Sequence, residues 1–267
     1  MIKPGEIQKI ARQCAVRDTQ IEKDYVLSWI LYGIAKHEKL SRAFAFKGGT
    51  ALKKAYFQDY RFSEDLDFTL LDEAITKNKI SEWFEELFVF VREESNIPLE
   101  FTDEIMCSDS GYNMYINYIG PFGGMGAHKK VKVDISRDEI LEFEPQLKQL
   151  FLIYSDVAAH KLKCYTLEEI LIEKMRSVLQ RTQPRDLYDI WNLLVIKGLD
   201  IKFLQPYFER KAKNKGYNPT QFPEKLDSKL NSYKARWQGS LRDQINNLPN
   251  FDQVVREINK HIRTLNL

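Results

Sequence analysis

Apolar residues in the first third of the chain recur every three or four positions, the spacing of helices with one buried face. Pro4 can occupy the first turn of one helix, which then runs to about Val16. Asp18 and Thr19 can cap the start of the next, and residues 72–96 show the same spacing again. The pattern therefore predicts two helices at the start of the chain and an amphipathic helix further along.

Strands are predicted where apolar residues run together or alternate with polar ones. The run AFAFKGG at 43–49 ends in two glycines, and DLDFTLL at 65–71 alternates acidic with apolar residues. Three further strands are expected at 99–106, 112–119 and 129–135. Beyond these strands the apolar spacing becomes almost wholly helical, with breaks at prolines and glycines.

The order of elements is helices, then a region of mixed strands and helices, then helices alone, which predicts an α+β fold. A mixed sheet would form the core, with helices on its flanks and a C-terminal helical bundle. We expect two domains, residues 1–155 with the sheet and the N-terminal helices, and residues 156–267 as a helical domain. The 267 residues are 43% hydrophobic, enough for a buried core, which excludes disordered and fibrous proteins.

The charge is distributed unevenly, although the net charge is only +2. Residues 197–267 contain 14 Lys/Arg and 7 Asp/Glu, a balance of +7, whereas the preceding 196 residues contain 26 and 31, a balance of −5. A basic segment of this kind can hold a polyanion while an acidic region carries out chemistry. It is equally consistent with a solvated helical surface rich in lysine.

Cysteine usage and hydropathy predict a cytoplasmic protein without a membrane segment. The three cysteines are far apart and form no CxxC pair, which fits a reducing compartment and argues against disulfides and a structural zinc site. The four histidines show no metal-ligand spacing. Residues 1–23 lack an apolar core, so we expect no signal peptide, and the longest apolar stretch, residues 26–35, is too short to span a bilayer.

Two glycines stand directly after the first predicted strand and before a predicted helix. Gly48 and Gly49 would let the backbone approach a ligand closely. The helix that opens near Thr50 would direct free N–H groups and its positive dipole end to the same place. A phosphate is the usual ligand of such an arrangement, and a simple turn is the alternative.

Acidic residues on two predicted strands are candidate metal ligands. Asp65 and Asp67 are two positions apart on one strand, so both side chains project from the same face. Asp134 joins them if its strand is a neighbour; alone, an Asp-x-Asp pair would more simply be solvated acids on an edge strand. Three carboxylates can hold two Mg²⁺ ions for an in-line phosphoryl displacement, with Asp134 also a candidate general base. Arg61 and Ser63 precede the acids on a loop from which they could reach phosphate oxygens.

Five segments of the chain form a recognisable set. They are IEKDYVL at 21–27, GGTAL at 48–52, RFSEDLDF at 61–68, KVDI at 132–135 and EKMRSVLQRTQPRDLYDIW at 173–191. The set resembles the nucleotidyltransferase superfamily with a DNA polymerase beta-like core. More narrowly, it resembles the nucleotidyl transferase AbiEii/AbiGii toxin family.

The resemblance implies roles for particular residues. It places three residues in the nucleotide site: Gly48, Gly49 and Thr50. It implies Asp65 and Asp67 as metal ligands, and Lys174 and Asp186 as active-site members that the helical domain contributes to the cleft. Lys174 could neutralise triphosphate charge, while Asp186 follows Pro184 at a helix start. A solvated lysine and a helix-start acid are the alternative interpretations of these last two residues.

The resemblance also implies an activity, the transfer of an NMP from an NTP to a hydroxyl group with release of pyrophosphate and two Mg²⁺ ions. It implies the toxin of a bacterial toxin–antitoxin or phage-defence pair, with RNA as acceptor, such as the 3′ end of a tRNA, and a cognate antitoxin encoded nearby. The basic segment 197–267 would help to hold the RNA. Two alternatives stay open: transfer to a small molecule such as an aminoglycoside or to a protein hydroxyl, and a catalytically silent nucleotide-binding module. The paired acids argue against the silent module, which does not need them.

Overall fold

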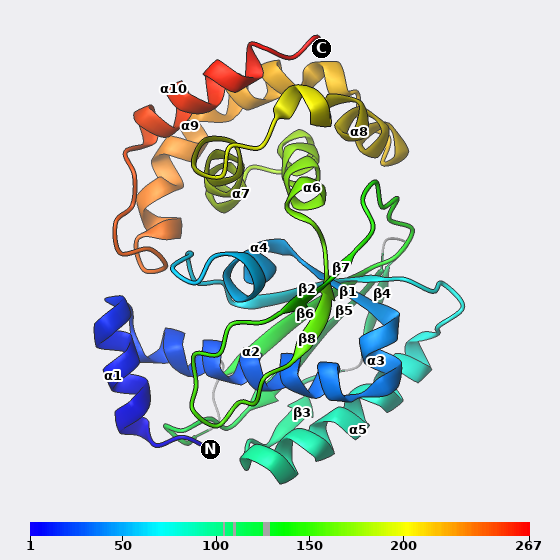
Figure 1. Ribbon diagram of the computed structural model, residues 1–267, viewed down its shortest axis with the longest axis vertical. Helices are drawn as coiled ribbons and strands as arrows, with labels where there is room; N and C mark the ends of the chain where they lie inside the picture. The colour runs from blue at the N-terminus through cyan, green and yellow to red at the C-terminus, as the bar shows by residue number, and fades with distance from the viewer. Residues whose placement is uncertain (104, 109–110, 125–128) are drawn as a thin grey trace. The chain divides into compact units, whose positions relative to one another are not determined.

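The computed structural model describes residues 1–267 apart from 104, 109–110 and 125–128. The chain divides into two compact units (Figure 1). Residues 1–139 and 145–164 form the first, called the sheet unit below. Residues 140–144 and 165–267 form the second, called the helical unit.

Helices of the sheet unit form where the apolar spacing predicts them, with two differences: one helix starts later than expected, and the short helix Glu38–Ala43 is separate from the helix before it. They are α1 (Pro4–Cys14), α2 (Asp18–Lys36), α3 (Glu38–Ala43), α4 (Gly48–Ala51) and α5 (Lys77–Ser95). Pro4 occupies the first turn of α1, as predicted. The helix expected from residue 72 begins only at Lys77, because the Thr76 hydroxyl accepts a hydrogen bond from the Lys79 amide and caps the helix there.

In the described part of the chain, eight strands form one mixed sheet. They are β1 (Phe44–Lys47), β2 (Asp65–Leu70), β3 (Leu99–Phe101), β4 (Met106–Ser108), β5 (Gly111–Tyr118), β6 (Lys130–Ser136), β7 (Gln146–Gln149) and β8 (Lys161–Cys164). Their order across the sheet is β3-β5-β6-β2-β1-β8-β7, and β4 also pairs with β5. β2 runs parallel to β6 and β1 parallel to β8, while the other pairs are antiparallel.

The strands differ from the expected ones in two places. The strand expected at 99–106 is divided into β3 and β4, which pair with different parts of β5, and residue 104 lies outside the described residues. The sequence pattern does not indicate β7 or β8, because QLKQ and KLKC are short and mostly polar. Since β8 pairs with β1, the sheet unit extends to Cys164, beyond the expected domain boundary at residue 155.

The centre of the sheet has one apolar and one polar face. On β6, Val131, Val133 and Ile135 are buried and alternate with polar residues, as the sequence predicts. On β1, Phe44 packs against Phe84 of α5 with ring centroids 6.3 Å apart, so the apolar face lies against that helix. The opposite face carries the polar positions of β1, β2 and β6.

The helical unit contains five α-helices in its described residues. They are α6 (Leu167–Gln180), α7 (Pro184–Trp191), α8 (Ile201–Asn214), α9 (Phe222–Leu241) and α10 (Phe251–Ile262). Residues 140–144 join this unit because Glu169 accepts hydrogen bonds from the amides of Glu142 and Phe143, both at 3.0 Å. The α+β class, the mixed sheet and the C-terminal helical region are thus confirmed. No helix in the described ranges is long and apolar enough to cross a membrane.

Candidate active site

A row of polar side chains crosses the centre of the sheet. Asp67 of β2 stands opposite Lys47 of β1 on one side and opposite Asp134 of β6 on the other. Two positions before it on β2, Asp65 stands opposite Lys132. Paired residues of neighbouring strands project from the same face of a sheet, so the three acids share one face, as the sequence predicts. The same face also carries Lys47, Lys130 and Lys132, to which the sequence pattern assigns no role.

Gly48 begins α4 and lies directly against Asp67. Its φ of 77° is in the left-handed region, which glycine adopts without steric cost. A Cβ at this position would overlap with the Asp67 carboxylate. Glycine is therefore required for two reasons, the backbone turn from β1 into α4 and the close approach of the carboxylate.

The next two residues join α4 to the segment that carries the acids. A Cβ on Gly49 would overlap with the guanidinium of Arg61, which is buried. The Thr50 hydroxyl donates a hydrogen bond to the backbone carbonyl of Asp65 at 2.5 Å. Ser63, between the arginine and this acid, is buried as well. The structure thus brings the glycine pair and its threonine together with the Arg-x-Ser-x-Asp segment.

α4 continues as a π-helical turn at Leu52–Tyr56, and a buried ion pair holds this turn. The ammonium of Lys54 lies 2.6 Å from Oδ2 of Asp24 in α2, and the Tyr154 hydroxyl donates to the same oxygen at 2.7 Å. Burial lowers the pKa of Lys54, and the charge of Asp24 acts in the opposite direction. The contact gives a physical role to part of the IEKDYVL segment, for which the sequence pattern alone offered none.

Glu22, also in that segment of α2, holds the chain just before β6. Its side chain is buried, and one oxygen accepts hydrogen bonds from the Phe122 amide at 2.9 Å and from the Lys129 ammonium at 3.1 Å. β6 begins at the following residue, Lys130. The buried carboxylate therefore fixes the entry to the strand that carries Asp134.

Asp134 has one carboxylate oxygen engaged and one open. Lys132 donates a hydrogen bond to Oδ2 at 2.6 Å. Oδ1 is buried and accepts no hydrogen bond from any residue in the described part of the chain. Burial alone would lower the pKa of Lys132, but the hydrogen bond and charge of Asp134, together with the charge of Asp65, raise it. The lysine therefore stays charged beside the acids.

The residues on this face fit a divalent metal ion, although they form no ready-made cage. Within the described residues there is no group of three or more His, Cys, Asp or Glu side chains placed to hold a metal. Oxygen ligands are nevertheless present, since Asp65 and Asp67 project from one face beside Asp134, whose Oδ1 has no hydrogen-bond donor among those residues. A buried carboxylate oxygen without a donor is costly, and a cation would relieve that cost. The expected pair of Mg²⁺ ions stays a prediction.

A second charged cluster lies in the helical unit. The ammonium of Lys174 in α6 lies 2.7 Å from Asp186 and 2.8 Å from Asp189, both in α7. Arg181 donates to the two carboxylate oxygens of Asp186 at 2.8 and 3.1 Å. The two acids are only 2% and 0% exposed. Burial alone would raise the pKa of Asp186, but the charges of Lys174 and Arg181 outweigh it and hold this pKa well below its ordinary value.

The structure thus places Lys174 and Asp186 in direct contact and adds a member that the sequence pattern did not assign. Asp189 follows Asp186 by three residues, so the two acids lie on one face of α7, a spacing from which the pair could have been found. Tyr188 and Trp191 are buried, with ring centroids 5.7 Å apart, and belong to the core of this unit.

The sequence matches the model of a protein family, and the fold matches solved structures. A family model, the nucleotidyl transferase AbiEii toxin of type IV toxin–antitoxin systems, matches residues 29–257. No curated protein matches the sequence. The solved structure of MenT4, a nucleotidyltransferase toxin from Mycobacterium tuberculosis, is 15% identical over 100% of this chain and 91% of that chain, with a TM-score of 0.68. JHP933 from Helicobacter pylori is 17% identical over 93% of this chain and 92% of that chain, with a TM-score of 0.52.

At these identities the two structures establish a shared fold alone. The family match covers residues 29–257, most of the chain, and therefore establishes the family. The matched range includes the glycine pair, both strands that carry the acids, and the charged cluster around Lys174. Membership implies an NTP as substrate, a divalent metal and an antitoxin as partner. The chain belongs to the nucleotidyl transferase AbiEii toxin family of type IV toxin–antitoxin systems and is a nucleotidyltransferase.

Proposed function

We propose that this enzyme transfers an NMP from an NTP to a hydroxyl group of RNA and that the reaction needs Mg²⁺. The observation that carries the proposal is the register of Asp67 and Asp134 on neighbouring parallel strands, beside Asp65 and the turn at Gly48. Carboxylates gathered in this way supply the hard oxygen ligands that Mg²⁺ prefers. A glycine turn into a helix leaves room for phosphate groups close to the backbone.

In this proposal the acids have distinct tasks. Asp65 and Asp67 hold the metal, which when bound offsets the negative charge of the triphosphate and of the departing pyrophosphate. Asp134 presents Oδ1 either to the same ion or to the proton of the attacking hydroxyl, because Lys132 already engages Oδ2. The hydroxyl oxygen forms a bond to the α-phosphorus as the bond from that phosphorus to the pyrophosphate oxygen breaks.

The nucleotide site would be formed by the turn and the segment packed against it. Gly48, Gly49 and Thr50 would place the backbone against the phosphates, because side chains at the two glycines would displace Asp67 and Arg61. Arg61 would add positive charge close to this turn. Ser63, buried in the same segment, would supply a hydroxyl to the wall of the site.

We assign a positioning role in the same reaction to Lys174 and Asp186. Lys174 and Asp186 form a cluster with Asp189 and Arg181. The cluster contains two acidic and two basic side chains, so its net charge is close to zero. A lysine held between two carboxylates fixes the start of α7 against α6. This assignment rests on the family resemblance together with the burial of the ion pair.

As a toxin, the enzyme would act in the cytoplasm on cellular RNA, for which we propose the 3′ end of a tRNA as the acceptor. The family implies an antitoxin partner, and phage defence is the proposed role of the pair. The basic segment 197–267, with its balance of +7, supports a polyanionic acceptor over a cationic small molecule.

The decisive experiment incubates the purified protein with each labelled NTP, Mg²⁺ and total RNA. We expect one or more NTPs to label RNA, and EDTA to abolish the labelling. If no NTP labels RNA, the RNA acceptor is wrong. Parallel reactions with an aminoglycoside and with a protein extract test the two other hydroxyl acceptors.

A further inference from the structure

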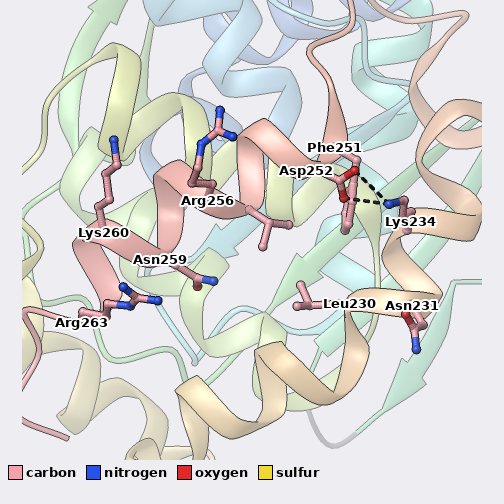
Figure 2. A pocket seen from close by; sticks show the side chains of 10 residues that line it. Leu230, Asn231, Lys234, Phe251, Asp252, Arg256, Asn259, Lys260 and Arg263 are labelled. Atoms are coloured by element: carbon pink, nitrogen blue, oxygen red, sulfur yellow. Dashed lines mark hydrogen bonds and ion pairs between the residues drawn. The ribbon is translucent and has the colours of Figure 1, made fainter.

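A basic groove runs between α9 and α10 of the helical unit. Its volume is about 530 Å³. Figure 2 shows Lys234 on α9 facing the groove, and the side chains of Arg256, Asn259, Lys260 and Arg263 following α10 along it. The groove thus combines four cationic side chains with the amides of Asn231 and Asn259.

The arrangement of these side chains follows from the period of the helix. Arg256, Lys260 and Arg263 are spaced four and three residues apart, so they lie on one side of α10 and extend over about 10 Å at 1.5 Å per residue. Val254 and Ile258 lie on another side and are fully buried in the core of the unit. Packing of the apolar side therefore fixes the direction of the basic stripe.

Nearby acids compensate the charges of this stripe only in part. The pKa of Glu257 is lowered by hydrogen bonds from Trp191 and Gln253, and the charges of Lys260 and Arg256 add to this effect. The one acid that lines the groove, Asp252, is engaged by Lys234 at 2.8 Å. Among the described residues, no carboxylate lies within ion-pair distance of Arg256, Lys260 or Arg263, and all three are exposed.

Some other cations of the same unit are paired with carboxylates. Arg210 lies 2.6 Å from Glu142, and Lys211 lies 2.6 Å from the buried Glu169. Three exposed cations along one wall of a groove create a local positive potential.

We propose that the groove between α9 and α10 binds the sugar–phosphate backbone of the RNA acceptor, an inference that rests on the proposed function. Arg and Lys neutralise phosphates, and the amide of Asn259 can bond to phosphate or sugar oxygens. The groove is also lined by Leu230, Phe251 and Val255. Protein–protein interfaces are depleted in lysine, whereas two lysines line this groove. The chemistry therefore favours a polyanionic strand over a protein partner.

Family membership does not by itself imply this groove. The family model ends at residue 257, so Asn259, Lys260 and Arg263 lie beyond the matched range. The groove would supply contacts to the acceptor in addition to the contacts at the site of chemistry.

The test measures binding of fluorescently labelled tRNA to the full chain by anisotropy, without NTP or metal. The variant Arg256→Gln/Lys260→Gln removes two charges from the groove. The control Lys202→Gln/Lys225→Gln removes two exposed charges elsewhere in the unit. We expect roughly tenfold weaker binding by the groove variant at low salt, and a salt dependence of log K shallower by about 1 to 2, against little change in the control.

A charge-preserving variant, Arg256→Lys/Lys260→Arg, guards against a folding defect and should bind RNA like the unaltered chain. Equal binding by the groove variant and the Lys202/Lys225 control would overturn the proposal. The labelling assay separates this failure from failure of the proposed function. If both double variants label RNA equally well at limiting RNA, the groove proposal is wrong and the transfer reaction stands. If RNA binding depends on the groove but no NTP labels RNA, the transfer reaction is wrong and the groove proposal stands.

Discussion

The two charged clusters of this enzyme are built from the same kinds of side chain but are balanced differently. In the sheet unit, Lys132 engages one oxygen of Asp134, and the other accepts no hydrogen bond from a described residue. In the helical unit, Lys174 and Arg181 engage both oxygens of Asp186. An open carboxylate oxygen can take up a cation or a proton, whereas a fully engaged acid mainly holds the fold together. Chemistry should therefore depend on the first cluster and stability on the second.

The largest effect is expected from Asp67→Asn, which removes a proposed metal-ligand charge opposite Lys47. We expect transfer to fall by a factor of roughly 100 or more, while the unfolding temperature stays within a few degrees. Labelling of the acceptor and a thermal melt measure the two quantities. Asp59→Asn, at an exposed position outside the site, is the matched control and should keep full activity. Full activity of the Asp67 variant would refute the assignment of the site.

Lys174→Ala should act on stability, because it leaves Asp186 and Asp189 buried without their shared cation. Breaking a buried pair costs about 3–5 kcal/mol in free energy of unfolding, which urea denaturation measures. Lys225→Ala, at an exposed position, should change it by less than about 0.5 kcal/mol. Equal stability of the two variants would show that the cluster is not structural.

The same cluster predicts a pH dependence. The pKa of Asp186 is lowered in the folded state, because the charges of Lys174 and Arg181 outweigh the effect of burial. Its contribution to stability is therefore complete above the ordinary aspartate pKa of about 4 and is lost as the pH falls below it. The unaltered chain should lose more stability than Lys174→Ala between about pH 4 and pH 2. Parallel losses in the two proteins over this range would contradict the ion pair.

Gly48→Ala should have a smaller effect on stability and a specific effect on the site. A residue with a Cβ pays about 1–2 kcal/mol for the left-handed backbone, and at Gly48 that Cβ also displaces the Asp67 carboxylate. Gly198→Ala is the control, because its φ of 75° is similar and a Cβ there meets nothing within 4 Å. Both variants should lose stability in urea denaturation, and only Gly48→Ala should also lose transfer activity. Activity that falls equally in both would point to backbone strain alone.

The acids were predictable from sequence because strand alternation is a local property. Asp65 and Asp67 had to share a face, and the alternation of Val131 and Val133 placed Asp134 on the polar side of its strand. The charged partners were harder to predict. Lys54 and Asp24 are 30 residues apart and meet only in the folded chain.

Other features lacked a local pattern or had one that was ambiguous. The strands β7 and β8 have four residues each, too few for alternation to be distinguished from a loop. Lys132 precedes Asp134 by two positions on one strand, so their contact could have been inferred. A lysine on a strand is usually solvated, so the acids alone mark the site in the sequence.

The smallest effect, and the one that tests the comparison of the two clusters most directly, is expected from Lys132→Gln. Loss of the ammonium removes the hydrogen bond to Oδ2 of Asp134. It also removes a positive charge opposite Asp65. Since Lys132 is about one-third exposed, solvent screens its charge, and we expect Mg²⁺ to bind more tightly by a factor of only about 2 to 5. Calorimetric titration of Mg²⁺ in the presence of a non-hydrolysable NTP measures this change. Lys130→Gln removes the same charge two positions earlier on β6, where the lysine lies over the Tyr115 ring instead of on an acid. Equal Mg²⁺ affinities for the two variants would mean that Lys132 does not compete with the metal.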